Sequence, residues 1–295
     1  MGVIDHMTRP IPVSWPRART RWRLAASAVL ALTSVLGPAV PAHSAGYVIA
    51  QAQGFDSCTR PTASQMSTWW ANSPYYVYYN YIGGSSYNSN CSAPSGSWID
   101  TVTSSASQAW NLVFTWVGPQ APASCTSRSF STYMSLNTTT AYNQGTSEGA
   151  SAYNKLVNLG VSTLNAPVAY DIEGYNGGAS CRAAVKSLMK GWADQLALAP
   201  AQKSGSYGSS CSAYIDDFAS DGNSPDFIWG ADWGNSKNTT SISCVSDTHW
   251  TNHQRHEQWK GGHSETWGGV TLSIDSDCAN GPTYGTHSPN DGLCS

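Results

Sequence analysis

The stretch PVAYDIEGY at positions 167–175 joins a short apolar run to two acidic residues, Asp171 and Glu173. The run lacks a clean alternation of polar and apolar side chains, which favours a strand buried on both faces. Three other short runs end on an aspartate or are directly followed by one: 48–56 with Asp56, 226–231 with Asp232 and 270–274 with Asp275. The pattern predicts a sheet of buried strands with carboxylates along one edge.

The rest of the chain extends this pattern. The candidate strands are 48–56, 75–82, 112–117, 167–172, 204–207, 226–231, 254–259 and 270–274. The candidate helices are 63–71, 99–110, 149–159, 183–198 and 212–219. Strands that alternate with helices favour parallel pairing through crossovers, and eight such units in about 250 residues fit one (β/α)₈ barrel. The sequence therefore predicts the α/β class and a single TIM-like barrel. The sequence signals are weakest for its fifth strand and for the helices after Gly234 and Gly261.

The first 45 residues differ in charge from the rest, with five arginines, no lysine and one acid. An arginine-rich segment precedes the apolar run 24–40, and small residues follow it. This order predicts a secretory signal peptide over 1–45, cleaved between Ala42 and Tyr47. The alternative is a membrane anchor, but a spanning helix needs about 20 apolar residues and a glycine and a proline interrupt this run. We expect a secreted domain at 46–295 that is not held in the membrane after cleavage, with cell-wall association left open.

Composition limits the partners of that domain. Residues 46–295 hold 10 basic and 17 acidic residues, a net charge of −7, which is unfavourable for binding nucleic acid. Charged residues make up 11% of the chain, against about 25% in ordinary soluble domains. A hydrophobic content of 40%, with 13 Trp and 15 Tyr, nevertheless indicates a compact protein. We expect a monomer.

The eight cysteines all lie after position 57, in no CxxC pair, which argues against a structural zinc site. In an exported protein an even number of cysteines favours disulfides. Eight cysteines allow 105 connectivities. The pair Cys58–Cys91 is the preferred one, because each would follow one of two successive strands.

Residues at the carboxyl ends of barrel strands form the active sites of such barrels. Side chains two positions apart on a strand point the same way, so Asp171 and Glu173 should both face the mouth, about 6.6 Å apart at the backbone. Two close carboxylates in a partly dry cleft do not both ionise easily, and a protonated acid is what glycoside cleavage requires. The other expected strand-end residues are Asp56, Asp232, Trp233, Gln258, Trp259, Asp275 and Asp277.

Three weaker motifs are interpreted as structural. GTSEG at 145–149 matches GxSxG, but no strand leads into it, so it is taken as the start of a helix with Ser or Thr capping. His249, His253 and His256 have a metal-like spacing, yet Lys260 stands where HExxH needs its second histidine. We predict no metal and no other cofactor. Four tryptophans near strand ends are candidates for stacking on sugar rings or for the core: Trp229, Trp233, Trp259 and Trp267.

The motifs GFD, YYNYIGG, WVGPQ, YDIEGY, ADWG and ETWGGVTLSID together resemble a family of secreted glycoside-hydrolase-like barrels of poorly defined function, related to the family 25 (Chalaropsis-type) lysozymes. The resemblance covers about positions 50 to 285. It implies a TIM-like barrel in which Glu173 is the general acid and Asp171 positions the substrate N-acetyl group, with Asp56 and Asp275 as the first-strand and last-strand aspartates. The cysteine set and the long loop 121–144 are not lysozyme features.

Two functions follow from this resemblance and from the acids. One is a hydrolase that cuts β-1,4 bonds next to N-acetylated sugars in peptidoglycan by substrate-assisted acid catalysis. The other is a catalytically silent barrel that binds cell-wall glycan. The predicted catalytic residues are Glu173 and Asp171, and the predicted substrate-binding residues are Asp56, Asp232, Gln258, Asp275, Trp233 and Trp259.

Overall fold

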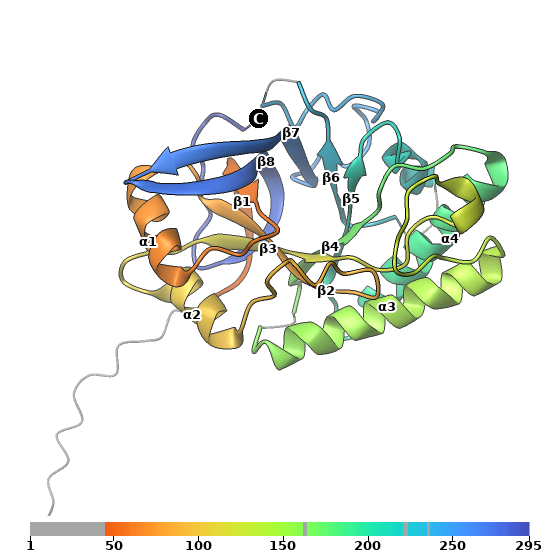
Figure 1. Ribbon diagram of the computed structural model, residues 1–295, viewed down its shortest axis with the longest axis horizontal. Coiled ribbons are helices and arrows are strands. Elements are labelled where there is room, and N and C mark those ends of the chain that lie inside the picture. The colour runs from red at the N-terminus through yellow and green to blue at the C-terminus, as the bar shows by residue number, and fades with distance from the viewer. Residues whose placement is uncertain (1–44, 162–163, 221–223, 235–236, 295) are drawn as a thin grey trace, which may run out of the picture. The chain divides into compact units, whose positions relative to one another are not determined.

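The computed structural model describes residues 45–161, 164–220, 224–234 and 237–294 (Figure 1). The signal peptide predicted over 1–45 therefore lies almost wholly outside the described residues. The strands are β1 (Gly46–Asp56), β2 (Val77–Gly83), β3 (Asn111–Trp116), β4 (Pro167–Asp171), β5 (Lys203–Ser209), β6 (Phe227–Ala231), β7 (Arg255–Trp267) and β8 (Val270–Gly285). The helices are α1 (Ala63–Asn72), α2 (Gly96–Ser104), α3 (Thr138–Asn158) and α4 (Ala179–Leu196), with short 3₁₀ turns at Ala123–Cys125 and Ile215–Ser220.

The eight strands close into one barrel in chain order, which confirms the predicted α/β barrel. Strands β1 to β7 pair in parallel, but β8 is antiparallel to both β7 and β1, so the expectation of parallel pairing is wrong for the last strand. The physical reason is a tight turn between β7 and β8. Gly268 and Gly269 have φ of +56° and +81°, the left-handed backbone that a two-residue hairpin requires.

This hairpin also corrects the bounds of the last two strands. The predicted strands 254–259 and 270–274 are the inner and outer parts of much longer strands, which project past the barrel beside α1 (Figure 1). Asp275 and Asp277 therefore do not end the last strand. Asp275 lies at the mouth because it pairs with Asp56, the last residue of β1, and β8 then runs back toward the opposite end.

Helices α3 and α4 lie side by side outside the barrel (Figure 1). The GxSxG motif lies in the middle of α3, so the prediction that it starts a helix is wrong, while no strand precedes it, as expected. The first glycine of the motif is needed for packing, because a Cβ on Gly145 would lie 2.0 Å from the Leu188 backbone oxygen of α4. The helix predicted at 99–110 is the shorter α2, and the helix predicted at 212–219 is the 3₁₀ turn Ile215–Ser220.

Two layers of buried side chains hold the barrel. One fills the space between the sheet and the helices, and the other fills the barrel interior with Tyr79, Phe227 and Trp229 among small residues. All eight cysteines are described and all are paired: Cys58–Cys91, Cys125–Cys181, Cys211–Cys244 and Cys278–Cys294. The predicted pair Cys58–Cys91 is confirmed and joins the segments that follow β1 and β2.

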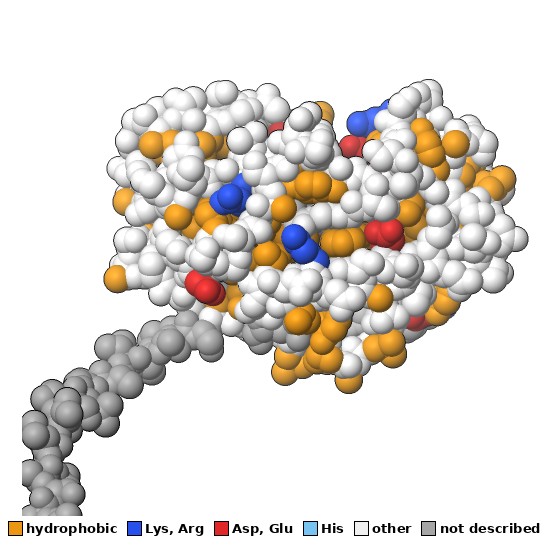
Figure 2. Space-filling model, turned by 60° about the horizontal axis from the view of Figure 1, so that its bottom comes forward, with side chains coloured by type: hydrophobic (Ala, Val, Ile, Leu, Met, Phe, Trp, Pro, Cys, Tyr) orange, Lys and Arg blue, Asp and Glu red, His pale blue; other side chains and the backbone are white. Residues whose placement is uncertain are grey.

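The surface reflects the composition. Figure 2 shows a face on which Lys, Arg, Asp and Glu side chains are few among hydrophobic and other side chains. Within the described ranges, no helix has both the length and the apolar character needed to span a membrane.

Candidate functional site

The mouth of the barrel is built around Gln258 of β7, which is fully buried. Its side-chain oxygen accepts hydrogen bonds from the Tyr207 hydroxyl at 3.0 Å and the Trp233 indole at 2.7 Å. Its side-chain nitrogen donates to Asp56 Oδ2 at 2.7 Å, and the Tyr81 hydroxyl donates to Asp56 Oδ1 at 3.4 Å. Gln258 thus fixes both the first-strand carboxylate and an indole at the rim.

Three carboxyls meet where β1 and β8 pair. Asp275 lies opposite Asp56, accepts a hydrogen bond from the Gly262 backbone N–H, and lies 3.5 Å from the Gln258 side-chain nitrogen. Burial, and then the charge of Asp275, raises the pKa of Asp56 well above its usual range. Asp277 is fully buried below them and accepts from the Trp229 indole at 2.8 Å; burial, and then the charge of Asp56, raises its pKa well above the usual range too. Burial also raises the pKa of Asp275.

Asp171 and Glu173 lie on the opposite wall of the mouth, and the two side chains differ in burial. Asp171 is the last residue of β4 and is 6% exposed, whereas Glu173 lies beyond the strand with 38% of its side chain exposed. Burial, followed by the charges of Glu173 and Asp56, raises the pKa of Asp171 well above its usual range. The raised pKa that was expected of one acid in this region is found at Asp171.

The backbone between these two acids is clamped by Gln120, a fully buried residue of the WVGPQ motif. Its side chain donates to the Asp171 carbonyl at 2.7 Å and accepts from the Glu173 N–H at 2.8 Å. Sequence reasoning quoted this motif and gave Gln120 no role. A glutamine just after a strand, next to a strand that ends in two acids, was the available signal.

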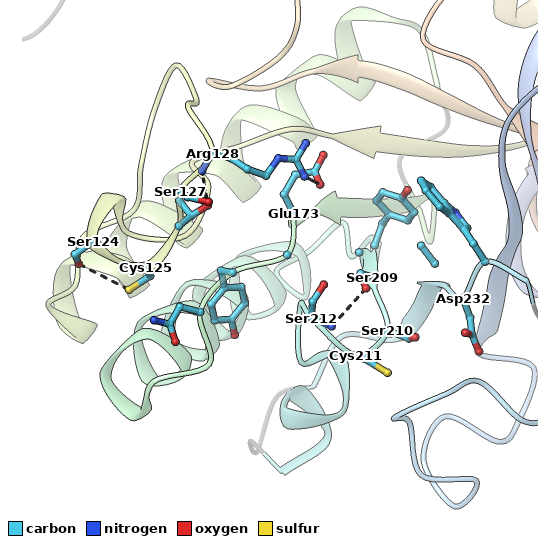
Figure 3. A pocket seen from close by; sticks show the side chains of 18 residues that line it. Ser124, Cys125, Ser127, Arg128, Glu173, Ser209, Ser210, Cys211, Ser212 and Asp232 are labelled. Atoms are coloured by element: carbon cyan, nitrogen blue, oxygen red, sulfur yellow. Dashed lines mark hydrogen bonds and ion pairs between the residues drawn. The ribbon is translucent and has the colours of Figure 1, made fainter.

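Arg128 is a second residue that sequence reasoning missed. Its guanidinium donates from Nη1 to Glu173 Oε2, and the two side chains point toward each other in Figure 3. Arg128 belongs to the long loop after β3, far from any strand end in sequence, so no pattern marked it.

Two hollows lie over the mouth. The larger mouth cavity, of about 970 Å³, is lined by Ser124–Arg128, Glu173–Asn176, Tyr207–Ser212 and Ala231–Trp233, with the serine side chains of two loops facing it (Figure 3). The smaller mouth cavity, of about 520 Å³, includes Tyr81, Gln120, Ser129–Ser131, Asp171 and Glu173 in its lining. Glu173 lines both, so a ligand that extends from one hollow into the other passes this carboxylate.

Trp233 forms part of the rim of the larger mouth cavity. Its side chain is 65% exposed although its indole N–H is bonded to Gln258. Gly261 lies against the ring: a Cβ there would lie 2.5 Å from an indole carbon. An aromatic ring that is supported on one side, tethered at its nitrogen and open to solvent suits stacking against a sugar ring.

A family model matches residues 67–279 of this sequence, and its description is Rv2525c-like, glycoside hydrolase-like domain. The chain belongs to this family. The predicted resemblance to glycoside-hydrolase-like barrels is confirmed, and the matched range includes Asp171, Glu173 and Asp275 of the candidate site. Asp56 lies before the matched range.

The solved structures that match this member of the Rv2525c-like family share little sequence with it. The Mycobacterium tuberculosis Tat-secreted protein Rv2525c is 14% identical, with a TM-score of 0.48 over 77% of this chain and 95% of that chain. A family 25 glycosyl hydrolase from Bacillus anthracis is 11% identical, with a TM-score of 0.47 over 79% of this chain and 90% of that chain. GHIP, a glycosyl hydrolase 25 of Streptococcus pneumoniae, is 9% identical, with a TM-score of 0.47 over 77% of this chain and 86% of that chain. No curated protein sequence matches the chain.

The remaining predicted site residues lie in different places. Asp232 lines the larger mouth cavity, and its Oδ2 accepts from the Ser243 N–H at 2.8 Å. The Lys237 ammonium lies over the Trp259 ring, 5.2 Å from the ring centre, and Trp259 lines neither mouth cavity. Trp229 is a fully buried core residue and Trp267 packs against the hydrophobic core.

The three histidines do not converge on one point. His249 bonds Asp216 at 2.7 Å, His253 bonds Asn280 at 2.7 Å, and His256 bonds the Tyr79 hydroxyl inside the barrel at 2.7 Å. Burial lowers the pKa of His256 to about 3. In the part of the chain that the structure describes, no group of three or more His, Cys, Asp and Glu residues is arranged to hold a metal ion.

Proposed function

We propose that the protein is a secreted glycoside hydrolase that acts on cell-wall peptidoglycan and cleaves β-1,4 bonds next to N-acetylated sugars. The observation on which this rests is the pair at the end of β4. Asp171 is buried and its Oδ1 makes no hydrogen bond within the described residues, while Glu173 lines both mouth cavities. A buried acceptor without a donor costs about 1–3 kcal/mol, which favours a ligand N–H at that point.

The proposed reaction is substrate-assisted. Glu173 protonates the leaving glycosidic oxygen, while Asp171 accepts a hydrogen bond from the N–H of the substrate acetamido group and directs its carbonyl oxygen at the anomeric carbon. Asp56 and Asp275 lie together at the barrel closure, where an ionised member of the pair supplies negative charge for the oxocarbenium-like transition state. Trp233 carries a sugar ring at the rim.

Purified peptidoglycan is the substrate for the test, with mass analysis of the muropeptides released. Glu173→Gln should lower turnover by about 10²–10⁴, the usual contribution of general acid catalysis, and Asp171→Asn by a comparable factor. Asp100→Asn, an exposed position of α2, is the matched control and should keep wild-type turnover. Binding of insoluble peptidoglycan is measured in parallel by sedimentation.

One observation, the ion pair between Arg128 and Glu173, favours a second function. This pair keeps the side chain of Glu173, the proposed general acid, in contact with a positively charged guanidinium. In that case the barrel binds cell-wall glycan without cleaving it, and the carboxylates accept hydrogen bonds from sugar hydroxyls. If wild type and Glu173→Gln sediment equally with peptidoglycan and neither releases a fragment, this glycan-binding function replaces the hydrolase.

We further propose that the protein acts outside the cell. Four disulfides in a chain whose described cysteines are all paired suit an oxidising compartment. The expected signal peptide over 1–45 would deliver the domain there, as a monomer that needs no metal or cofactor.

A further inference from the structure

Arg128 is the one cationic side chain among the described residues that line the two mouth cavities. Residues Ser124–Arg128 line the larger cavity, and Ser129–Ser131, which follow directly, line the smaller one. The loop therefore runs along the boundary between the two hollows, where Glu173 also lies. In a chain with 11% charged residues, a guanidinium at this point is a specific feature rather than one of many surface charges.

The loop that carries Arg128 is fixed to the same framework as Glu173. Cys125 is bonded to Cys181 at the start of α4, and its carbonyl accepts from the Asn176 N–H at 2.7 Å. Gln120, which clamps Glu173, also accepts at its backbone oxygen from the Met134 N–H at 2.7 Å. The two charged side chains are thus placed opposite each other by covalent and buried contacts.

The ion pair itself is open to exchange. The Arg128 side chain is 56% exposed, and the hydrogen bond from Nη1 to Glu173 is the one that its guanidinium makes within the described ranges. A guanidinium has five N–H donors arranged to bind a carboxylate through two parallel bonds. Exposed ion pairs contribute little to stability, so the pair with Glu173 leaves the guanidinium accessible to another carboxylate that enters the cavity.

We propose that Arg128 binds a carboxylate of the glycan and makes the site selective for acidic sugar chains, in particular those with a carboxylate on an ether side chain of an N-acetylated sugar. The proposal rests on the glycan-directed function proposed above. When the substrate carboxylate takes the guanidinium, Glu173 loses its cationic partner and lies near a second anion.

Binding of defined disaccharides tests the proposal without relying on turnover. The probes are N-acetylglucosaminyl-N-acetylmuramic acid, the same disaccharide with its carboxylate converted to an amide, and N,N′-diacetylchitobiose. Titration calorimetry with the wild type should show tighter binding of the acid than of the amide by about ten- to a hundredfold, the usual effect of one hydrogen bond to a charged group. Arg128→Gln should bring this ratio to about one, and Arg128→Lys, which keeps the charge but not the fork, should leave it in between.

Arg182→Gln is the matched control, because Arg182 also forms an ion pair, with the partly buried Asp217, but lies outside both mouth cavities. It should keep the wild-type ratio. Equal binding of acid and amide by the wild type, or an unchanged ratio in a folded Arg128→Gln protein, overturns the Arg128 proposal while glycan binding stands. Absence of binding to all three probes overturns both. If the wild type prefers the acid over the amide, Arg128→Gln abolishes this preference, and the wild type cleaves no peptidoglycan, then the Arg128 proposal stands. In that case only the hydrolase function is overturned.

Discussion

Replacing Asp277 by asparagine should remove part of the pH dependence of stability. Asp277 is fully buried, and burial with the charge of Asp56 raises its pKa well above the usual range. A carboxyl with a raised pKa in the folded state stabilises the fold fully below the pKa of the unfolded chain, about 3.9, and this contribution is lost as the pH rises through the folded pKa. Asparagine keeps the oxygen that accepts from the Trp229 indole at 2.8 Å, but it carries no titrating proton.

The size of the effect follows from the number of protons involved. While folded Asp277 holds a proton that the unfolded chain has released, the free energy of unfolding falls by about 1.4 kcal/mol per pH unit. Asp56, Asp171 and Asp275 add slopes of the same sign, because their pKa values are raised too, but they are present in both proteins. The difference between Asp277→Asn and the wild type should therefore grow in favour of the variant by up to about 1.4 kcal/mol per pH unit above pH 4.

Urea unfolding followed by tryptophan fluorescence, with disulfides intact, measures this difference between pH 4 and pH 8. Asp100→Asn on the exposed side of α2 is the control and should run parallel to the wild type. If the stability difference between Asp277→Asn and the wild type is the same at every pH, Asp277 does not hold a proton in the folded protein and the description of the carboxyl cluster is wrong.

Two further predictions concern the fold and maturation. Gly145→Ala should destabilise the protein by about 1–3 kcal/mol in thermal unfolding, because the new Cβ would lie 2.0 Å from the Leu188 oxygen, whereas Ser151→Ala on the exposed side of α3 should change little; equal stability of the two variants would contradict the close packing of α3 on α4. N-terminal sequencing of the exported protein should find a start between residues 42 and 47, and a start at Met1 or retention in the membrane would rule out the signal peptide.

Much of the barrel could be predicted because its strands are short, buried and bounded by turn residues. Even the weakest strand, predicted at 204–207, lies within β5, where a Cβ on Gly205 would meet the Phe227 ring at 2.3 Å, so small residues are needed and leave a faint pattern. The direction of β8 was missed because strand periodicity is the same for parallel and antiparallel pairing. The Gly268-Gly269 turn was the local signal for a hairpin.

The candidate site also contains residues that could be predicted from the sequence and residues that could not. The acids at strand ends were identifiable because a barrel brings strand ends together, whatever the loops do. Gln120 lies just after β3, and its place beside the two acids was an available signal that was not used. Arg128 was not assigned, because its position depends on loop 121–137, which is held by the Cys125–Cys181 disulfide and by hydrogen bonds from distant segments. Sequence spacing carries no information on such contacts until the loop is folded.

The reversed direction of β8 has a consequence for how the acids at the mouth are interpreted. It pairs Asp275 directly with Asp56 across two adjacent strands, where like charges destabilise a sheet, and it buries Asp277 beneath them. Three carboxyls placed together at such a cost, in a chain with so few charges, indicate retention for a reason other than stability. If Asp277→Asn gains stability as the pH rises while Asp56 and Asp275 remain necessary for glycan cleavage or binding, then the carboxyl cluster destabilises the folded protein and is retained for its role at the mouth.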